Sequence, residues 1–256
     1  MSYHCGIGAS MAAAFGVQPR EPHITCDGCG FLNAQRATLT TGTPLVNGGN
    51  LEGYLVQRGN IAIEGAGLDA SQSDYTDLIS RAIQINAGLW ARQLRVTTGA
   101  NRVDAEHTQA SAAAGVGATP TLALDVARLG GMYAGKISLV ATESGLGVRN
   151  AGDIGASAGE VVISADGQLQ NAGRISASDS LRIDSEAGIL NSGTVYAQGN
   201  VHLGTRGDID NSGGSASIAA QGNLALAASG AHRKARVLRL FIVLSCGTMF
   251  GRAADQ

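Results

Sequence analysis

Four copies of an Asn-(Ala/Ser)-Gly tripeptide recur along this chain at an almost constant spacing. They begin at Asn150, Asn171, Asn191 and Asn211, so successive copies are 21, 20 and 20 residues apart. Each copy has an aliphatic residue two positions before the Asn, another after the Gly, and an alternating aliphatic pair that closes the unit. Self-similarity at a fixed period is the signature of a repeat architecture.

The period restricts the fold class. Helical repeats contain two or three helices and need about 33 to 47 residues. A spacing of 20 or 21 residues instead accommodates three short strands and three corners, which is one coil of a parallel β-helix. The alternating pairs send one side chain inward and the next outward, and Gly and Asn suit the corners. The sequence therefore predicts an all-β solenoid of roughly nine or ten coils, because one coil buries little on its own.

Stacked coils lie about 4.8 Å apart, so equivalent residues of successive units are expected to lie over one another. The four repeat asparagines, Asn150, Asn171, Asn191 and Asn211, are then expected to form a ladder of hydrogen-bonded amides. We interpret this ladder as structural and not as a ligand site.

Composition limits the classes of partner. The chain has 256 residues, a formal net charge of -2, 37 Gly and only 4% aromatic residues. This balance gives no electrostatic reason to expect a nucleic-acid partner or an acidic membrane surface. The first twenty residues have no basic start followed by an apolar run, so we expect no signal peptide there. No stretch reaches the roughly 18 apolar residues of a membrane span.

Several longer segments resemble a known family. They are ITCDGCGFLN (24–33), RATLTTGTP (36–44), GNIAIEGAGLD (59–69), INAGLW (85–90), VTTGAN (96–101) and LGGMYAGKI (129–137). They are similar to the secretion (haemagglutination-activity) domain of filamentous-haemagglutinin-like exoproteins of two-partner secretion systems. The repeat array is similar to the haemagglutinin repeats of the same family. The resemblance covers about residues 24 to 230.

The resemblance implies a right-handed single-stranded parallel β-helix with an extra-helical segment. It also implies a secreted or cell-surface protein, exported through an outer-membrane partner barrel. The favoured function is a fragment of an adhesin that attaches to a receptor or glycan on host cells or neighbouring bacteria. The alternative within the family is the stalk of a contact-dependent growth inhibition toxin. A rival from another class is a β-helix enzyme that cleaves polysaccharides. We expect no enzyme activity, metal or cofactor.

The resemblance divides the chain into four parts. Residues 1–23 do not match, residues 24–140 resemble the C-terminal part of the secretion domain, and residues 141–230 carry the 20-residue repeats. Residues 231–256 form a basic and apolar tail, which is either a membrane-surface segment or, as we favour, out-of-frame sequence. In the family, a long leader and Asn-Pro motifs precede the Cys pair, whereas only 25 residues precede Cys26 here. We therefore expect that this chain is not exported on its own.

Cys26-x-x-Cys29 admits three interpretations: a redox pair, half of a zinc site, or a structural disulfide. Zinc needs two further ligands, and no second paired motif is present. A thioredoxin-like site needs a βαβ setting, which is not predicted here. Oxidised pairs are typical of secreted proteins, and the family resemblance implies a small disulfide-closed loop, so we favour the disulfide.

Four weaker candidates remain. Arg206-Gly207-Asp208 is an integrin-type tripeptide and a weak candidate for host-cell attachment from a protruding corner, although we favour a packed corner. Asp69, Asp74 and Asp77 form the only carboxylate cluster suited to glycan cleavage, although Asp74 is better read as a cap before an extra-helical segment at residues 75–79. Gly130-x4-Gly135-Lys136 imitates a phosphate-binding loop but is followed by Ile instead of Ser or Thr. Trp90, the single Trp, is expected to pack beneath the extra-helical segment and not to serve as a binding platform.

Overall fold

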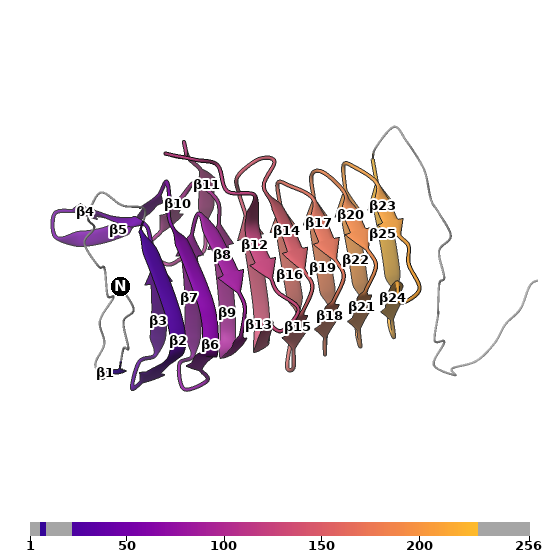
Figure 1. Cartoon of the computed structure of the whole chain (residues 1–256), viewed down its shortest axis with the longest axis horizontal. Coiled ribbons are helices and arrows are strands. Elements are labelled where there is room, and N and C mark those ends of the chain that lie inside the picture. The colour runs from indigo at the N-terminus through magenta and orange to yellow at the C-terminus, as the bar shows by residue number, and fades with distance from the viewer. Residues whose placement is uncertain (1–5, 9–21, 230–256) are drawn as a thin grey trace, which may run out of the picture.

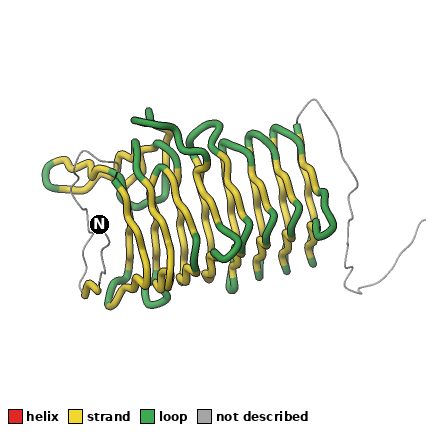
Figure 2. The backbone as a smooth tube through the Cα atoms, viewed as in Figure 1, coloured by secondary structure: helices red, strands yellow, loops and turns green. Residues whose placement is uncertain are grey.

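The computed structural model describes residues 6–8 and 22–229, and in these ranges the chain consists of strands, turns and loops without a helix. No helix of the described part is therefore suited to cross a membrane. The strands stack side by side along one axis and form a solenoid (Figures 1 and 2). Almost all of the predicted leading segment 1–23 and the whole predicted tail 231–256 lie outside the described residues.

Parallel strands stack in three columns, which are the three sides of the coil. The first column contains β3 (Arg36–Thr40), β7 (Tyr75–Ser80), the second halves of β9 (Gly88–Thr98) and β13 (Gly131–Ala141), β16 (Val161–Ala165), β19 (Leu181–Ser185), β22 (Val201–Thr205) and β25 (Leu224–Ala228). Each strand pairs in register with the equivalent strand of the next coil, as the 20-residue period predicts.

The other two sides follow the same order. The second column contains the first halves of β2 (His23–Leu32) and β6 (Asn60–Ala70), then β8 (Ala82–Ile85), β12 (Leu122–Val126), β14 (Gly147–Asn150), β17 (Leu169–Asn171), β20 (Ile189–Asn191) and β23 (Ile209–Asn211). The third contains the second halves of β2 and β6, the first halves of β9 and β13, then β15 (Asp153–Ala156), β18 (Arg174–Ala177), β21 (Thr194–Ala197) and β24 (Ser217–Ala220). A short strand, β1 (Gly6–Gly8), pairs with the end of β2.

The interior of the coil is a continuous aliphatic core. Val148, Leu169 and Ile189 stack in register and are each at most 1% exposed. The other predicted aliphatic positions stack in the same way. In the last described coil Ile218 is buried, whereas Ile209, Leu224 and Leu226 are partly buried. Each buried aliphatic side chain contributes about 1.5–3 kcal/mol. The prediction of a parallel β-helix stabilised by stacked aliphatic residues is confirmed.

A second, antiparallel sheet lies outside the coil. It contains β4 (Thr43–Asn47), β5 (Asn50–Val56), β10 (Asn101–Asp104) and β11 (Ala110–Ala112), in the order β11-β10-β5-β4. Its β4–β5 hairpin protrudes from the N-terminal end of the solenoid (Figure 1). This sheet and the loop that follows β11 occupy part of the chain without adding coils. Within residues 22–229, the first and second columns each contain eight strands, compared with the nine or ten coils estimated for the chain.

The extra-helical segment exists, but its predicted position at residues 75–79 is wrong. Those residues belong to β7, which pairs with β3 on one side and with β9 on the other. Thr76, Leu78 and Ile79 of this strand are at most 1% exposed. The polar residues of this segment suggested a surface loop, whereas Asp77 and Ile79 are buried against residues of the antiparallel sheet and of the turn after β10.

Candidate functional site

The four repeat asparagines form a single file of hydrogen-bonded side chains. The amide nitrogen of Asn150 donates to the side-chain oxygen of Asn171 (2.8 Å), Asn171 donates to Asn191 (2.7 Å), and Asn191 donates to Asn211 (2.6 Å). The first three amides also donate to backbone carbonyls: Asn150 to Arg174 (3.1 Å), Asn171 to Thr194 (3.2 Å), and Asn191 to both Gly193 (3.0 Å) and Ser217 (3.2 Å). All four asparagines are buried, with at most 6% of each residue exposed to solvent.

The file begins at Asn150. The residue stacked beneath it in the preceding coil is Val126, which cannot donate from its side chain. The side-chain oxygen of Asn150 is buried without a hydrogen-bond partner among the described residues. The hydrogen bonds of the file are made to other asparagines of the file or to backbone groups. These asparagine side chains therefore have little remaining capacity to bind a ligand.

Cys26 and Cys29 are joined by a disulfide whose Cα atoms are 5.4 Å apart. Cys26 is fully buried at the N-terminal end of the core. The bridge spans a corner of β2, where Gly28 has a φ of +69° and the register against β6 shifts between Asp27 and Cys29. The carboxylate of Asp27 accepts a hydrogen bond from the backbone of Ala66 (2.8 Å), so the corner is also attached to the next coil.

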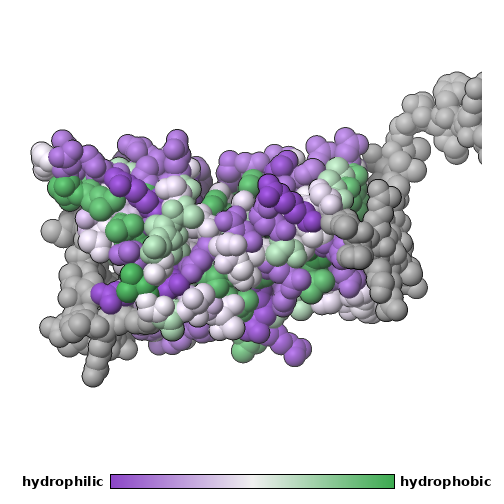
Figure 3. All heavy atoms as spheres, turned by 90° about the horizontal axis from the view of Figure 1, so that it is seen from above, coloured by the Kyte–Doolittle hydropathy of each residue, from purple (hydrophilic) through white to green (hydrophobic). Residues whose placement is uncertain are grey.

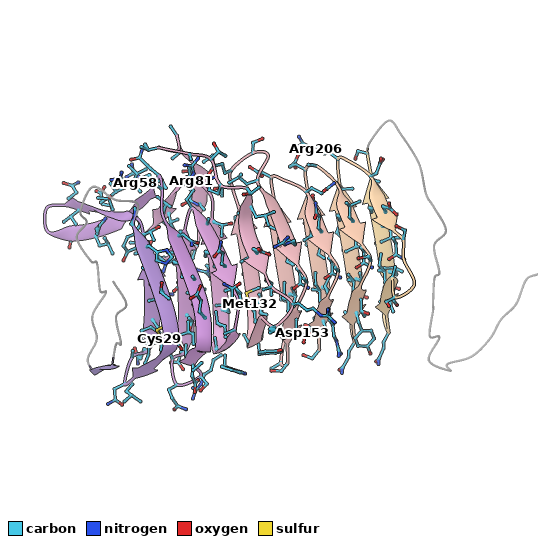
Figure 4. All side chains as sticks on the ribbon, in the orientation of Figure 1. Cys29, Arg58, Arg81, Met132, Asp153 and Arg206 are labelled. Atoms are coloured by element: carbon cyan, nitrogen blue, oxygen red, sulfur yellow. A yellow bond between two sulfur atoms is a disulfide. The ribbon has the colours of Figure 1, made fainter. Side chains whose placement is uncertain are left out.

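The Arg206-Gly207-Asp208 tripeptide lies at a corner that packs directly on the corner below. Arg206 pairs with Glu186 of the preceding coil (2.9 Å), and the labelled side chain projects from the edge of the solenoid (Figure 4). A Cβ on Gly207 would lie 2.8 Å from the backbone carbonyl of Ala187. The carbonyl of Asp208 accepts a hydrogen bond from the backbone of Ile189 (2.8 Å). The tripeptide is thus part of a compact corner and not of a protruding loop.

The three candidate catalytic aspartates point to different surroundings. Asp69 is exposed and accepts a hydrogen bond from the backbone of Ser71 (3.0 Å), and this bonding to Ser71 lowers its pKa. Asp74 pairs with Arg92 on the surface (3.1 Å) and caps no helix. Asp77 is 2% exposed. The three carboxylates therefore do not form one catalytic cluster.

Asp77 instead belongs to a buried polar group that the sequence did not reveal. Its carboxylate lies 3.1 Å from Nδ1 of His107 and 3.5 Å from Nε of Arg36. The ring of His107 packs against that of Tyr54 with 5.5 Å between centroids. Burial, and then the charge of Asp77, raise the pKa of the Tyr54 hydroxyl. These contacts join β7 of the coil to the antiparallel sheet and to the turn after β10.

A second buried pair holds the loop that follows β11. The guanidinium of Arg81 donates to both carboxylate oxygens of Glu143 (3.0 and 2.7 Å) and to the carbonyls of Val116 and Ala118 (2.9 and 3.1 Å). Glu143 also accepts from the backbone of Ala100 (2.9 Å). The hydrogen bonds from Arg81 hold the pKa of Glu143 below its usual range, although burial opposes this effect. Figure 4 shows Arg81 on the side of the solenoid that carries the extra-helical sheet.

Two further predictions concern Lys136 and Trp90. Lys136, the lysine of the segment that imitates a phosphate-binding loop, lies within strand β13 and pairs with Glu160 (2.6 Å).

Trp90 does not pack beneath the antiparallel sheet, so that prediction is wrong. It is 44% exposed and lies beside Tyr133 of the next coil, with ring centroids 6.3 Å apart and planes inclined by 20°.

The outer surface is otherwise a mixture of hydrophilic and hydrophobic side chains, with hydrophobic residues in separate small patches on the face shown in Figure 3. Among the residues that the structure describes, no three His, Cys, Asp or Glu side chains come together in a group that could hold a metal ion.

Comparison with known proteins agrees with this geometry. The family model of the TPS secretion domain matches residues 24–177. Toxin CdiA of Yersinia pestis is 56% identical over 178 residues, 69% of this chain and 5% of the relative. A tRNA nuclease CdiA of Yersinia mollaretii is 40% identical over 228 residues, 88% of this chain and 7% of the relative.

The fold is also found in a solved structure. The crystal structure of a filamentous hemagglutinin secretion domain superposes with a TM-score of 0.57 and 27% identity, over 81% of this chain and 61% of that one. The chain spans only about 5% of the length of the first curated relatives it matches. The match over residues 24–177, more than half of the chain, shows that the chain belongs to the TPS secretion domain family.

Proposed function

We propose that this chain is the secretion-domain region, with the first repeats, of a large exoprotein that leaves the cell through an outer-membrane partner transporter. The observation that carries the proposal is the match of residues 24–177 to the secretion domain, together with an unbroken column of stacked strands from β3 to β25. In the proposed division, residues 24–140 are the C-terminal part of the secretion domain and residues 141–230 are haemagglutinin-type repeats.

The architecture suits export of an extended chain. Each coil makes its contacts mainly with the coils on either side, so stability is close to a sum of nearest-neighbour terms and folding can propagate from one end. A chain that emerges from a pore one end first can therefore fold coil by coil. The coils that carry the disulfide and the antiparallel sheet offer a surface on which the following coils can stack.

We favour the stalk of a contact-dependent growth inhibition protein as the role of the whole protein. Relatives named toxin or nuclease CdiA share 40–56% identity with this chain, whereas the filamentous hemagglutinin domain shares 27%. In this role, the segment is a transport and spacer element, and any toxic activity belongs to another part of the protein.

An adhesin is the second candidate. A long rod on the cell surface offers repeated, outward-facing side chains to a receptor or glycan on host cells or neighbouring bacteria, and the exposed Trp90 and Tyr133 are the specific feature that favours such contact. Polysaccharide cleavage has no comparable support, since Asp69, Asp74 and Asp77 point to different surroundings.

An export experiment tests the proposal. Residues 24–229 replace the matching segment of the Yersinia pestis relative, and the chimaera is produced with that relative's transporter. Surface exposure, measured by protease digestion of intact cells, is expected at the level of the parent. A control chimaera carrying Leu181→Asp and Ile183→Asp introduces two charges into the core and is expected to fail. Absence of the first chimaera from the surface, with normal synthesis, would contradict the proposal.

The two roles are separated by the rest of the gene. A toxin domain near the end of the reading frame, followed by a small immunity gene, is expected for the growth-inhibition protein. A co-culture assay in which cells carrying the full-length protein inhibit neighbours lacking the immunity gene provides the functional measurement. Attachment to host cells without growth inhibition of neighbours supports the adhesin instead.

A further inference from the structure

Two aromatic rings lie side by side on the outside of the coil. Trp90 of β9 and Tyr133 of β13 are in register on neighbouring strands of the third column. They remain 44% and 39% exposed, with planes inclined by only 20°. Single exposed hydrophobic residues need no explanation, but two adjacent rings form one apolar surface, and aromatic faces contribute most when they are covered.

Glycines allow these rings to lie back over the sheet. A Cβ on Gly88 would lie 2.3 Å from Cη2 of Trp90, and a Cβ on Gly131 would lie 2.6 Å from the hydroxyl of Tyr133. A Cβ on Gly67, in the preceding coil, would lie 3.3 Å from Cζ3 of Trp90. Each ring therefore occupies space that a side chain two residues earlier would fill. The pair forms a broad aromatic surface, which we call the aromatic platform.

A hollow of about 420 Å³ lies beside the platform, within the range of about 300–1,000 Å³ typical of small-ligand sites. It exists because the next two positions of the same outward column are small: Gly155 and then Ser176 follow Tyr133 in register. A Cβ on Gly155 would lie 3.6 Å from Oγ of Ser176 and 3.8 Å from Cδ1 of Tyr133, so this position accepts a side chain in ordinary van der Waals contact with both residues. The hollow also includes Ser71, Ala91, Ala134, Ala156 and Ser157.

The residues that line the hollow are uncharged and provide both apolar surfaces and hydrogen-bonding hydroxyls. The hollow combines aromatic faces with the hydroxyls of Ser71, Ser157 and Ser176. Of the charged residues nearby, Arg92 is engaged by the carbonyl of Ser71 and by Asp74, and Asp153 accepts from the hydroxyl of Tyr133 (3.4 Å). A pyranose ring has the matching pattern, with C–H bonds on its faces and hydroxyls around its edge.

We propose that the aromatic platform and its hollow bind a neutral pyranose glycan, with a sugar face against Trp90 and Tyr133 and sugar hydroxyls hydrogen-bonded to the serines. The inference rests on the proposed function, because it requires that this segment reaches the cell surface. An anionic polysaccharide finds no free cationic side chain lining the hollow. Binding at this site is independent of export, so the two proposals fail separately.

The chain provides its own reporter, since Trp90 is its single Trp. The full chain is titrated with soluble cellohexaose, maltohexaose and chitohexaose while tryptophan emission is recorded, and a saturable change with at least one of these neutral glycans is expected. Gly155→Leu fills the hollow and keeps both rings, so it is expected to weaken binding at least tenfold, which corresponds to about 1.4 kcal/mol. Tyr133→Ala is expected to weaken binding to a similar extent.

Two matched variants control for folding. Ser164→Leu places the same new side chain on an exposed position of another column, and Tyr196→Ala removes a tyrosine of the same column beyond Ser176. Both are expected to bind as the parent chain does. The proposal is overturned if none of the three glycans changes the emission at millimolar concentration, or if Gly155→Leu binds normally. It is also overturned if only a sulfated oligosaccharide or a protein partner changes the emission.

Discussion

The side-chain amide of Asn171 donates to the side-chain oxygen of Asn191 across 2.7 Å, although the two residues are 20 positions apart in the chain. Asn171 in turn accepts from Asn150 (2.8 Å), so its side chain is bonded to the coil on either side. The interaction is buried, and a buried polar group that loses its partner costs about 1–3 kcal/mol.

Replacing Asn171 tests this relationship. Asn171→Ala leaves the buried side-chain oxygen of Asn191 without its donor, whereas the amide of Asn150 keeps its hydrogen bond to the carbonyl of Arg174. The free energy of unfolding is therefore expected to fall by about 1–3 kcal/mol, on the basis of one such group. Urea denaturation followed by circular dichroism measures the loss. Gln170→Ala, the exposed neighbour on the same strand, is the control and is expected to change stability by less than about 0.5 kcal/mol. Equal stability of the two variants would contradict a stabilising ladder.

The sequence revealed this ladder because the coils that contain it have a regular length. Once Asn150 and Asn171 are recognised as equivalent, the stacking of the aliphatic residues on both sides follows from the period. The same reasoning does not extend to Trp90 and Tyr133, which are in register although 43 positions separate them in the sequence. Strands β10 and β11 and the following loop interrupt the period between them.

The buried contact of Asp77 with His107 could not be predicted from the sequence either. It depends on the turn between β10 and β11, in which His107 adopts a φ of +58°, and on the packing of a strand that was expected outside the coil. A positive φ at a residue other than Gly is uncommon, and no periodic pattern marks it. Segments that leave the regular coil are therefore located from the three-dimensional structure and not from the sequence pattern.

Glycines at the corners give a second prediction. A Cβ on Gly173 would lie 2.0 Å from the carbonyl oxygen of Gly152 in the preceding coil, whereas a Cβ on Gly155 meets nothing closer than 3.6 Å. Gly173→Ala is therefore expected to destabilise the chain by about 1–3 kcal/mol, since it overpacks a fixed backbone contact. Gly155→Ala is expected to be neutral. Thermal unfolding of both variants gives the comparison, and similar melting temperatures would show that the corners can separate at little cost.

The disulfide gives a third prediction. Its loop is short, because the two cysteines are three positions apart, so its removal is expected to cost about 2 kcal/mol in the chain-entropy description. In a background with Cys5→Ser and Cys246→Ser, material made in the periplasm is expected to show no reactive thiol before reduction and two afterwards. After reduction, the melting temperature is expected to fall while the β-rich circular dichroism spectrum at room temperature persists. Two free thiols before reduction would contradict the pairing.

The buried pair of Asp77 and His107 gives a fourth prediction. Asp77→Ala leaves His107 and Arg36 without their acidic neighbour beneath the antiparallel sheet, and the loss of a buried polar partner typically costs about 1–3 kcal/mol. Faster amide hydrogen exchange is expected in β10 and β11 and in the turn between them. Asp74→Ala is the control, because Asp74 pairs with Arg92 on the surface, where an ion pair contributes about 0–1 kcal/mol. Unchanged exchange in β10 and β11 after Asp77→Ala would exclude this role.

The pair of Arg81 and Glu143 gives a prediction of pH dependence. The pKa of Glu143 is lowered in the folded chain, first by the hydrogen bonds from Arg81. A carboxyl group with a depressed folded pKa stabilises the fold at pH values above its unfolded pKa, about 4.3, and this contribution is lost as the pH falls through the folded pKa. Glu143→Gln is therefore expected to be less stable than the parent at pH 7, by about 1–3 kcal/mol for the altered buried hydrogen bonds.

The difference in stability between the parent chain and Glu143→Gln is expected to shrink below about pH 4.3, and urea denaturation at a series of pH values from 7 to 3 measures it. Glu160→Gln is the matched control, because Glu160 pairs with Lys136 at side chains that are 39% and 49% exposed. Solvent screening limits such a surface pair to about 0–1 kcal/mol, so this variant is expected to follow the parent at every pH. A difference for Glu143→Gln that stays constant from pH 7 to pH 3 would show that the charge of Glu143 does not stabilise the loop.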